Sequence, residues 1–165
     1  MEIIDKRVVV TGAASGIGKA LCKAFKDAGA KMIVAVDINL EGAKVTAKEI
    51  KGLAISANVA KEEDIKMVIQ EANNFCGGID IFCSNAGIGG APGFIEAEAG
   101  DWQNIWEVNV MAHIFAAKYV IPQMLKQGGG YLMNTASAAG LLTQLGAAGY
   151  SVTKAAAVSF AEWIK

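Results

Sequence analysis

The sequence predicts an α/β protein built on a doubly wound parallel sheet in the strand order 3-2-1-4-5, with helices on both faces in three α/β/α layers. Short apolar runs rich in β-branched residues recur along the chain, and each is followed by apolar residues at helical spacing. Continuous apolar runs of this kind are typical of strands buried on both faces of a parallel sheet. Strict alternation of such strands with helices, joined by right-handed crossovers, gives the doubly wound arrangement.

The expected elements follow one another without a linker or a solenoid repeat. The strands are expected at residues 7–11, 31–37, 53–59, 79–84 and 130–136. The helices are expected at residues 16–28, 40–51, 62–75 and 102–126, and a last helix begins near Tyr150 and still runs at Lys165. We expect the long fourth helix to bend at Pro122, because proline removes a backbone donor. Residues 1–165 are therefore expected to form a single domain.

The pattern stops early for this fold. A fifth strand and its helix normally lead to a sixth parallel strand, and none follows in the 165 residues. We therefore expect that the C-terminal strands are missing, and that the edge of the fifth strand and one helix face are uncovered.

Composition excludes several classes of function. The chain is 53% hydrophobic and 19% charged with a net charge of −1, and it has no lysine-rich patch that could neutralise nucleic-acid phosphates. Cys22, Cys76 and Cys83 lack the spacing of a metal or redox motif and are expected to be reduced thiols. An acidic residue at position 2 and no long apolar stretch before the first strand argue against a secretory signal. We expect a cytoplasmic protein that does not bind membranes.

A glycine-rich turn at residues 11–18 joins the first strand to the first helix. Glycines there permit a tight turn, a close approach of the backbone to a pyrophosphate, and tight packing of helix on strand. The helix N-terminus offers free N–H groups to the phosphates. Because the turn follows a strand and opens a helix, we expect it to bind a dinucleotide. The expected contacts are Gly12, Ser15, Gly16, Ile17 and Gly18.

Asp37 ends the second strand, about 20 residues after the glycine turn. Its carboxylate can accept hydrogen bonds from both hydroxyls of an adenosine ribose. It would repel a 2′-phosphate by about 1–4 kcal/mol for unit charges about 4 Å apart, and its neighbours Ser15 and Ile38 carry no charge to offset this. The residue favours NAD over NADP, although an aspartate that only caps a helix or ends a strand would look the same.

Tyr150 and Lys154 share one helix face at the spacing i, i+4. A phenol has a pKa near 10, and lowering it to about 7 requires roughly 4 kcal/mol of stabilisation of the phenolate. An ammonium about 4 Å away supplies about that much at an effective dielectric constant of about 20. Such a tyrosine can take the proton of an alcohol while hydride leaves to NAD. The pair alone is also found on solvated helices.

Other motifs give this pair a context. Asn85-Ala86-Gly87 follows the fourth strand, Asn109 lies in the long helix, and Ser137 follows the fifth strand. With the glycine turn and the Tyr150/Lys154 pair, this order and spacing resembles the short-chain dehydrogenase/reductase family over essentially the whole chain. The resemblance implies a Rossmann fold and the NAD-dependent, reversible oxidation of a secondary alcohol to a ketone.

The resemblance also implies a role for each residue. Tyr150 is the general acid/base, and Lys154 tunes it and holds the nicotinamide ribose. Ser137 orients the substrate oxygen, and Asn109 holds a water that links Lys154 to bulk solvent. Gly87 lets the backbone of Asn85, Ala86 and Gly87 lie close to the cofactor. Taken singly, Ser137 could simply cap a loop, Asn109 could form an ordinary hydrogen bond within a helix, and Gly87 could simply form a turn.

The chain departs from the family pattern in three places. Asn58 stands before Val59 where the family usually has an aspartate that meets the adenine amino group, and an amide oxygen can still accept that bond. Ser84 replaces the first residue of the usual Asn-Asn-Ala-Gly. Family members continue into a further strand, a Pro-Gly turn near the nicotinamide and a loop over the substrate, so the substrate-loop region is expected to be absent.

Partners and alternatives follow from the same resemblance. Family members pair through their long helices, so a homodimer or homotetramer is expected. His113, the only histidine, has no acidic or thiol residue at ligand spacing, and we expect a packing or interface residue and no metal site. Two other functions stay open: a non-catalytic NAD-binding fragment or scaffold subunit, and an NADP-linked carbonyl reductase. The small-molecule alcohol or ketone itself is not specified by the sequence.

Overall fold

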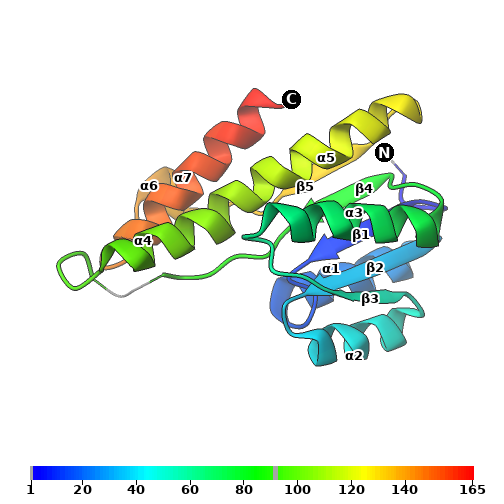
Figure 1. The fold of residues 1–165 in the computed structure, drawn as a ribbon, viewed down its shortest axis with the longest axis horizontal. Helices are drawn as coiled ribbons and strands as arrows, with labels where there is room; N and C mark the ends of the chain where they lie inside the picture. The colour runs from blue at the N-terminus through cyan, green and yellow to red at the C-terminus, as the bar shows by residue number, and fades with distance from the viewer. Residues whose placement is uncertain (1, 91–92) are drawn as a thin grey trace.

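The protein is described by a computed structural model of residues 2–90 and 93–165, in which a parallel sheet has the order β3-β2-β1-β4-β5 (Figure 1). The predicted topology is therefore confirmed. The strands are β1 (Arg7–Thr11), β2 (Met32–Asp37), β3 (Leu53–Ser56), β4 (Ile81–Ser84) and β5 (Tyr131–Asn134). The helices are α1 (Gly16–Asp27), α2 (Leu40–Ile50), α3 (Glu62–Cys76), α4 (Ala99–Trp106), the π-helical η1 (Glu107–Met111), α5 (Ala112–Lys126), α6 (Ala139–Leu142) and α7 (Ala148–Trp163).

The sheet is buried on both faces, as its apolar strands predict. Val9 in β1 packs into a core with α3 and α5, whereas its neighbours Val8 and Val10 pack into a second core with α1 and α2. Alternate residues of one strand therefore serve opposite layers. Figure 1 shows α3 and α5 running across the front of the sheet, with α1 behind it.

Four strands are shorter than predicted: β2 by one residue, and β3, β4 and β5 by more because their pairing covers fewer residues. The register between β2 and β3 ends with Asp37 opposite Ser56, so β3 stops there instead of reaching Val59. Strands β4 and β5 pair from Ile81 opposite Tyr131 to Ser84 opposite Asn134. Both strands therefore begin later than predicted, and β5 also ends earlier. Polar residues that were expected within strands thereby fall in the loops at the carboxyl ends.

The long helix differs more from the prediction. It begins at Ala99, where the Asp101 side chain accepts a hydrogen bond from the backbone N–H of Glu98 at 3.0 Å. It then passes through η1, in which the N–H of Ala112 bonds to the carbonyl of Glu107, five residues back. Pro122 lies within α5 without ending it, and the bend expected there stays a prediction.

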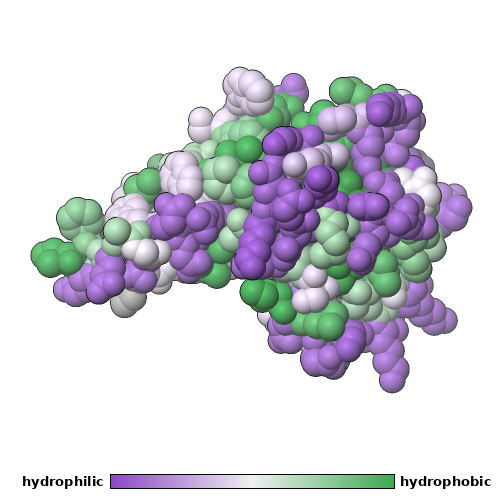
Figure 2. Space-filling view, viewed as in Figure 1, coloured by the Kyte–Doolittle hydropathy of each residue, from purple (hydrophilic) through white to green (hydrophobic). Residues whose placement is uncertain are grey.

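The C-terminal part also carries an element that the sequence did not predict, the short helix α6. Helix α7 starts at Ala148, before Tyr150, and ends at Trp163, so the expectation that it still runs at Lys165 is wrong. Tyr131 on the outer strand β5 is 51% exposed and Trp163 is 82% exposed, in line with the expected uncovered edge. Hydrophilic residues gather over α3 on the face shown in Figure 2. Within the described residues, no helix combines the length and apolarity needed to cross a bilayer.

Candidate functional site

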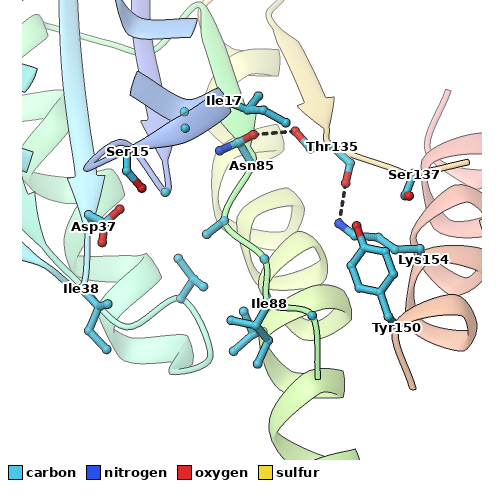
Figure 3. Close-up of a pocket in the computed structure, with 18 of the residues that line it drawn as sticks. Ser15, Ile17, Asp37, Ile38, Asn85, Ile88, Thr135, Ser137, Tyr150 and Lys154 are labelled. Carbon is cyan, nitrogen blue, oxygen red and sulfur yellow. Dashed lines mark hydrogen bonds between the residues drawn. The ribbon is translucent and has the colours of Figure 1, made fainter. Parts of the chain in front are cut away.

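The predicted site residues gather around one cleft of about 900 Å³ at the carboxyl ends of the strands. This is where β1 has β2 on one side and β4 on the other, the position at which doubly wound sheets bind ligands. Among the predicted residues, the cleft is lined by Gly12, Ser15, Gly16, Ile17, Gly18, Asp37, Ile38, Asn58, Val59, Asn85, Ala86, Gly87, Ser137, Tyr150 and Lys154. Asn109 lies behind the cleft and does not line it. Figure 3 shows the cleft with Asp37 on one side and Tyr150 on the other.

The glycine turn is packed too tightly for side chains at two positions. Gly12 has φ +71°, and a Cβ atom there would lie 2.9 Å from the Cα atom of Ala86. A Cβ atom on Gly18 would overlap the carbonyl group of Gly12. The turn therefore brings α1 directly against β1, and the N-terminal residues of α1 line the cleft. The first turn of α1 holds no acidic residue, so its positive end is available to an anion.

Asp37 is fixed by the backbone on both sides of it. Its Oδ2 accepts from the N–H of Ala14 at 2.9 Å, and its Oδ1 accepts from the N–H of Asn39 at 2.9 Å. The two bonds hold the carboxylate between the glycine turn and the start of α2, so the residue ends its strand and also faces the cleft. None of the ion pairs within residues 2–90 and 93–165 includes Asp37, so no cation masks its charge.

Asn58 and Val59 form the loop that follows β3. The backbone N–H of Asn58 donates to Asp64 at 2.8 Å, and its Oδ1 accepts from the N–H of Ala60 at 3.1 Å. Val59 is buried below the loop. An amide oxygen has two lone pairs, so Oδ1 can accept a second bond from a ligand in the cleft.

Asn85 joins the ends of three strands. Its backbone N–H donates to Thr11 Oγ1 at 2.9 Å, and its side-chain amide donates to the Thr11 carbonyl at 2.9 Å. Its Oδ1 accepts from Thr135 Oγ1 at 3.0 Å. Thr11 ends β1 and Thr135 directly follows β5, so one amide holds the floor of the cleft together. Neither threonine was among the predicted site residues, although each is a polar residue at the carboxyl end of a buried strand.

Lys154 is buried below Tyr150 at the far end of the cleft. Only 3% of Lys154 is exposed, and its Nζ donates to the carbonyl of Thr135 at 2.8 Å. The same Nζ lies 5.8 Å from the centre of the Tyr150 ring. Burial lowers the pKa of Lys154. Figure 3 shows both side chains reaching from α7 into the cleft, with Ser137 on the neighbouring segment.

Gly87 leaves room for this ammonium. A Cβ atom at position 87 would lie 3.4 Å from Lys154 Nζ and 3.1 Å from Asn109 Oδ1. A larger side chain would therefore crowd the lysine and the asparagine together. Gly87 acts on packing between elements as well as on the turn itself.

Asn109 is completely buried in η1, where both the oxygen and the nitrogen of its side-chain amide are hydrogen-bonded. Its Oδ1 accepts from the N–H of Ile88 at 2.9 Å, and its Nδ2 donates to the Ile88 carbonyl at 2.9 Å and to Thr153 Oγ1 at 3.2 Å. Asn109 therefore ties the segment after β4 to α7. Its expected part in a water relay stays a prediction.

Ser137 lies between β5 and α6 and is half-buried. Its Oγ accepts from the N–H of Ala139 at 3.2 Å, so it does cap a turn. That bond leaves the hydroxyl proton free to donate into the cleft. Several residues that were not predicted also line the cleft: Ala57, Ile88, Gly89, Asn104, Val108, Thr135 and Ala136.

Comparison with known proteins identifies the family. The pattern of the family described as short chain dehydrogenase matches residues 6–165. The chain belongs to the short-chain dehydrogenase family. Among similar sequences, cyclohexanol dehydrogenase of Acinetobacter sp. (strain SE19) is 35% identical over 172 residues, which cover 96% of this chain and 68% of that protein.

Solved structures of other short-chain dehydrogenases agree with this fold. A short-chain dehydrogenase/reductase from Burkholderia phymatum in complex with NAD aligns with a TM-score of 0.95 and 28% identity, over 99% of this chain and 60% of that one. The 3-ketoacyl-(acyl-carrier-protein) reductase from Brucella melitensis complexed with NADH aligns with a TM-score of 0.93 and 31% identity, over 98% and 69%. The chain thus spans between 60% and 69% of the length of these three relatives.

Proposed function

We propose that this short-chain dehydrogenase catalyses the NAD-dependent, reversible oxidation of a secondary alcohol to a ketone, with Tyr150 as general acid/base. The observation that carries the proposal is the buried ammonium of Lys154 beneath Tyr150, at the opposite end of the cleft from the glycine turn and Asp37. We further propose that residues 1–165 act as one NAD-binding domain that carries these catalytic residues.

The residues that line the cleft suit a dinucleotide. The N-terminus of α1, free of acidic residues, suits the pyrophosphate, and Gly16, where a Cβ would meet no protein atom within 4 Å, leaves space for a close backbone approach. Asp37 would hold the adenosine ribose, and the Asn58–Val59 loop would hold the adenine. The backbone of residues 85–87, with Tyr150 and Lys154, would hold the nicotinamide riboside. A nicotinamide held there would supply the acceptor for the hydride that leaves the alcohol carbon.

The residues of the chain handle the proton. Tyr150 takes the hydroxyl proton of the alcohol as its carbon loses hydride, and returns it when the ketone is reduced. An ammonium about 4–5 Å from the phenolate stabilises it by roughly 3–4 kcal/mol at an effective dielectric constant of about 20. The Ser137 hydroxyl donates a hydrogen bond to the substrate oxygen and so orients the substrate. Burial of Lys154 limits screening of its charge by solvent ions.

Asp37 supports NAD over NADP. Its carboxylate lies at the cleft with no ion-pair partner among the described residues, so a 2′-phosphate would meet a bare negative charge. The similar proteins from Burkholderia and Brucella were solved with NAD and with NADH.

Likeness to cyclohexanol dehydrogenase supports a secondary alcohol as substrate, since cyclohexanol is one. Likeness to a 3-ketoacyl reductase favours a second candidate, in which the same site works as a ketone reductase. We propose a homodimer or homotetramer, formed through the helices α4 and α5, as the working assembly.

The test is turnover of a panel of secondary alcohols with NAD by the purified protein, followed as NADH formation. Tyr150→Phe should lower kcat by about 10³-fold, the scale of general acid–base catalysis, and bind NADH within about threefold of the wild type. Tyr131→Phe is the control, because Tyr131 lies on the outer strand away from the cleft, and it should keep full activity. Substantial activity in Tyr150→Phe would contradict the proposal. NADH binding without turnover in the wild type would favour the non-catalytic alternative.

A further inference from the structure

His113 is buried behind the catalytic end of the cleft and does not line it. It extends from α5, is 1% exposed, and its Nδ1 lies 2.7 Å from Oγ of Ser84, the last residue of β4. This burial excludes the role at an exposed interface that the sequence left open. The position also gives Ser84, a departure from the family pattern, a hydrogen-bond partner.

The second nitrogen of His113 has a matching group within reach. Among the described residues, His113 Nε2 and Asn134 Oδ1 are both buried and each lacks a hydrogen-bond partner of ordinary geometry. Burial and, to a smaller extent, the charge of Lys154 lower the pKa of His113, and the Asn134 side chain offsets part of this shift. Asn134 ends β5 directly opposite Ser84 in the register of the sheet. Because Nδ1 is bonded to Ser84 on β4, Nε2 is the ring nitrogen left to pair with Asn134 on the adjacent strand β5.

With the buried oxygen of Asn134 paired to Nε2, only one arrangement of protons satisfies all three side chains. Asn134 Oδ1 can only accept, so Nε2 must carry the hydrogen. Nδ1 then accepts, and the Ser84 hydroxyl donates to it. Burial and the charge of Lys154 on α7 lower the pKa of His113 to about 4, so the ring is neutral. The groups that β4 and β5 present to it, Ser84 and Asn134, do not titrate.

This cluster connects to the lysine through one peptide unit. Thr135 follows Asn134, its carbonyl accepts from Lys154 Nζ at 2.8 Å, and its hydroxyl donates to Asn85 at 3.0 Å. The place where β5 ends therefore sets the place of the ammonium. Lys154 has no ion-pair partner within the described part of the chain, so this carbonyl is its main polar anchor there.

We propose that His113 is a positioning residue for Lys154: as the Nε2–H tautomer it ties Ser84 to Asn134 across the ends of β4 and β5 and so fixes the Thr135 carbonyl that holds the ammonium. The inference deepens the proposed function, on which it rests for its effect on turnover. A histidine that only fills space would leave the lysine where it is when replaced by a residue of similar size.

The first experiment needs no activity. Because His113 is the only histidine, protein labelled with ¹⁵N in histidine gives a single pair of ring-nitrogen signals. We expect the Nε2–H tautomer with no protonation down to about pH 5, given the lowered pKa. An Nδ1–H tautomer, or titration near the ordinary value of about 6.5, would overturn the inference.

The second experiment compares His113→Phe with His113→Gln, whose side-chain amide can donate in place of Nε2–H. In the Phe variant kcat should fall about tenfold with little change in KM for NAD, since small misplacements of catalytic groups are costly. The apparent pKa that governs kcat should rise by about one unit, because a displaced ammonium stabilises the Tyr150 phenolate less. In the Gln variant, both kcat and this apparent pKa should return most of the way to their wild-type values.

Val120→Ala, a buried change further along α5, is the control: it should lower stability and leave the pH profile unchanged. An unchanged profile in a folded His113→Phe, or a Gln variant no better than Phe, would overturn the positioning role. If the wild type turns over no substrate, the proposed function fails on its own. The pKa of Lys154, measured by NMR on ¹³C-labelled lysine, then decides, since it should rise toward its ordinary value in His113→Phe and stay lowered in His113→Gln.

Discussion

The two ends of the cleft are built on different principles. The glycine-turn end, between β1, α1 and β2, is made by backbone: two glycines that exclude side chains, a helix N-terminus, and a carboxylate held by two peptide N–H groups. The catalytic end, between β4, β5, η1 and α7, is made by buried side chains that hydrogen-bond across elements. The first end depends on close approach, and the second on a polar network.

The difference has an energetic side. The charges at the glycine-turn end face the cleft, where solvent or a ligand can meet them. Lys154 at the catalytic end is buried, and the histidine near it is neutral. Burial of the lysine charge lowers its pKa, which means that the charged lysine destabilises the folded state. Changes at the two ends should therefore affect stability and activity in different proportions.

The largest effect is expected from Lys154→Met. Turnover should fall by about 10³-fold while the free energy of unfolding near pH 7 stays the same or rises, because a desolvated charge is removed. A lysine pKa that is lower in the folded state means that wild-type stability should rise as the pH increases through that pKa toward the unfolded value. Lys154→Met should lack this rise in urea titrations. The control is Lys118→Met, which replaces an exposed lysine whose pKa is raised by the neighbouring Glu62. This variant should keep the rise of stability with pH. A clear loss of stability in Lys154→Met would contradict this account.

A smaller effect, on stability, is expected at the glycine turn. Gly12→Ala combines a positive φ with a Cβ contact of 2.9 Å to backbone, and should cost about 3 kcal/mol and weaken NADH binding. Gly77→Ala is matched to it, with φ +74° and open space around the Cβ, and should cost about 1 kcal/mol without affecting the cofactor. Equal costs in thermal unfolding would mean that close approach to Ala86 is unimportant.

The buried histidine predicts a loss of stability in acid. A folded-state pKa of about 4 lies below the unfolded value of about 6.5, so the stabilisation is complete above pH 6.5 and is lost as the pH falls toward 4. Between pH 7 and pH 5 the wild type should lose about 2 kcal/mol more than His113→Gln. Parallel stability curves for the two proteins would show that His113 titrates normally in the folded state.

The smallest effect is expected for cofactor choice. Asp37→Asn should move the ratio of NADH to NADPH affinity toward NADPH by about tenfold, by removing the repulsion of a 2′-phosphate. Asn39→Ala removes the cap of α2, where Asn39 accepts from Gly42 N–H, and should cost about 1 kcal/mol with the ratio unchanged. If both variants shift the ratio alike, loop disorder and not charge is responsible. Fluorescence titration with the two reduced cofactors measures both.

The same contrast explains what the sequence could predict. The glycine turn is contiguous and Asp37 ends the adjacent strand, so residue spacing alone placed that end of the cleft. At the catalytic end the motif residues were located, but their contacts were not: the Thr135 carbonyl has no sequence signature, and the Asn109 side chain bonds to the backbone of Ile88. Ser84 looked like a minor departure until α5 placed His113 against it.

The helix that carries Asn109 has one residue more than regular winding would need. Each residue turns an α-helix by about 100°, so shortening the Glu107–Met111 segment by one residue would rotate α5 by that angle relative to α4. Asn104 and Val108 could then not face the cleft while His113 faces the ends of β4 and β5. Apart from Asn109, the segment should accept changes of side chain more readily than changes of length, because its length sets the rotation of α5 relative to α4.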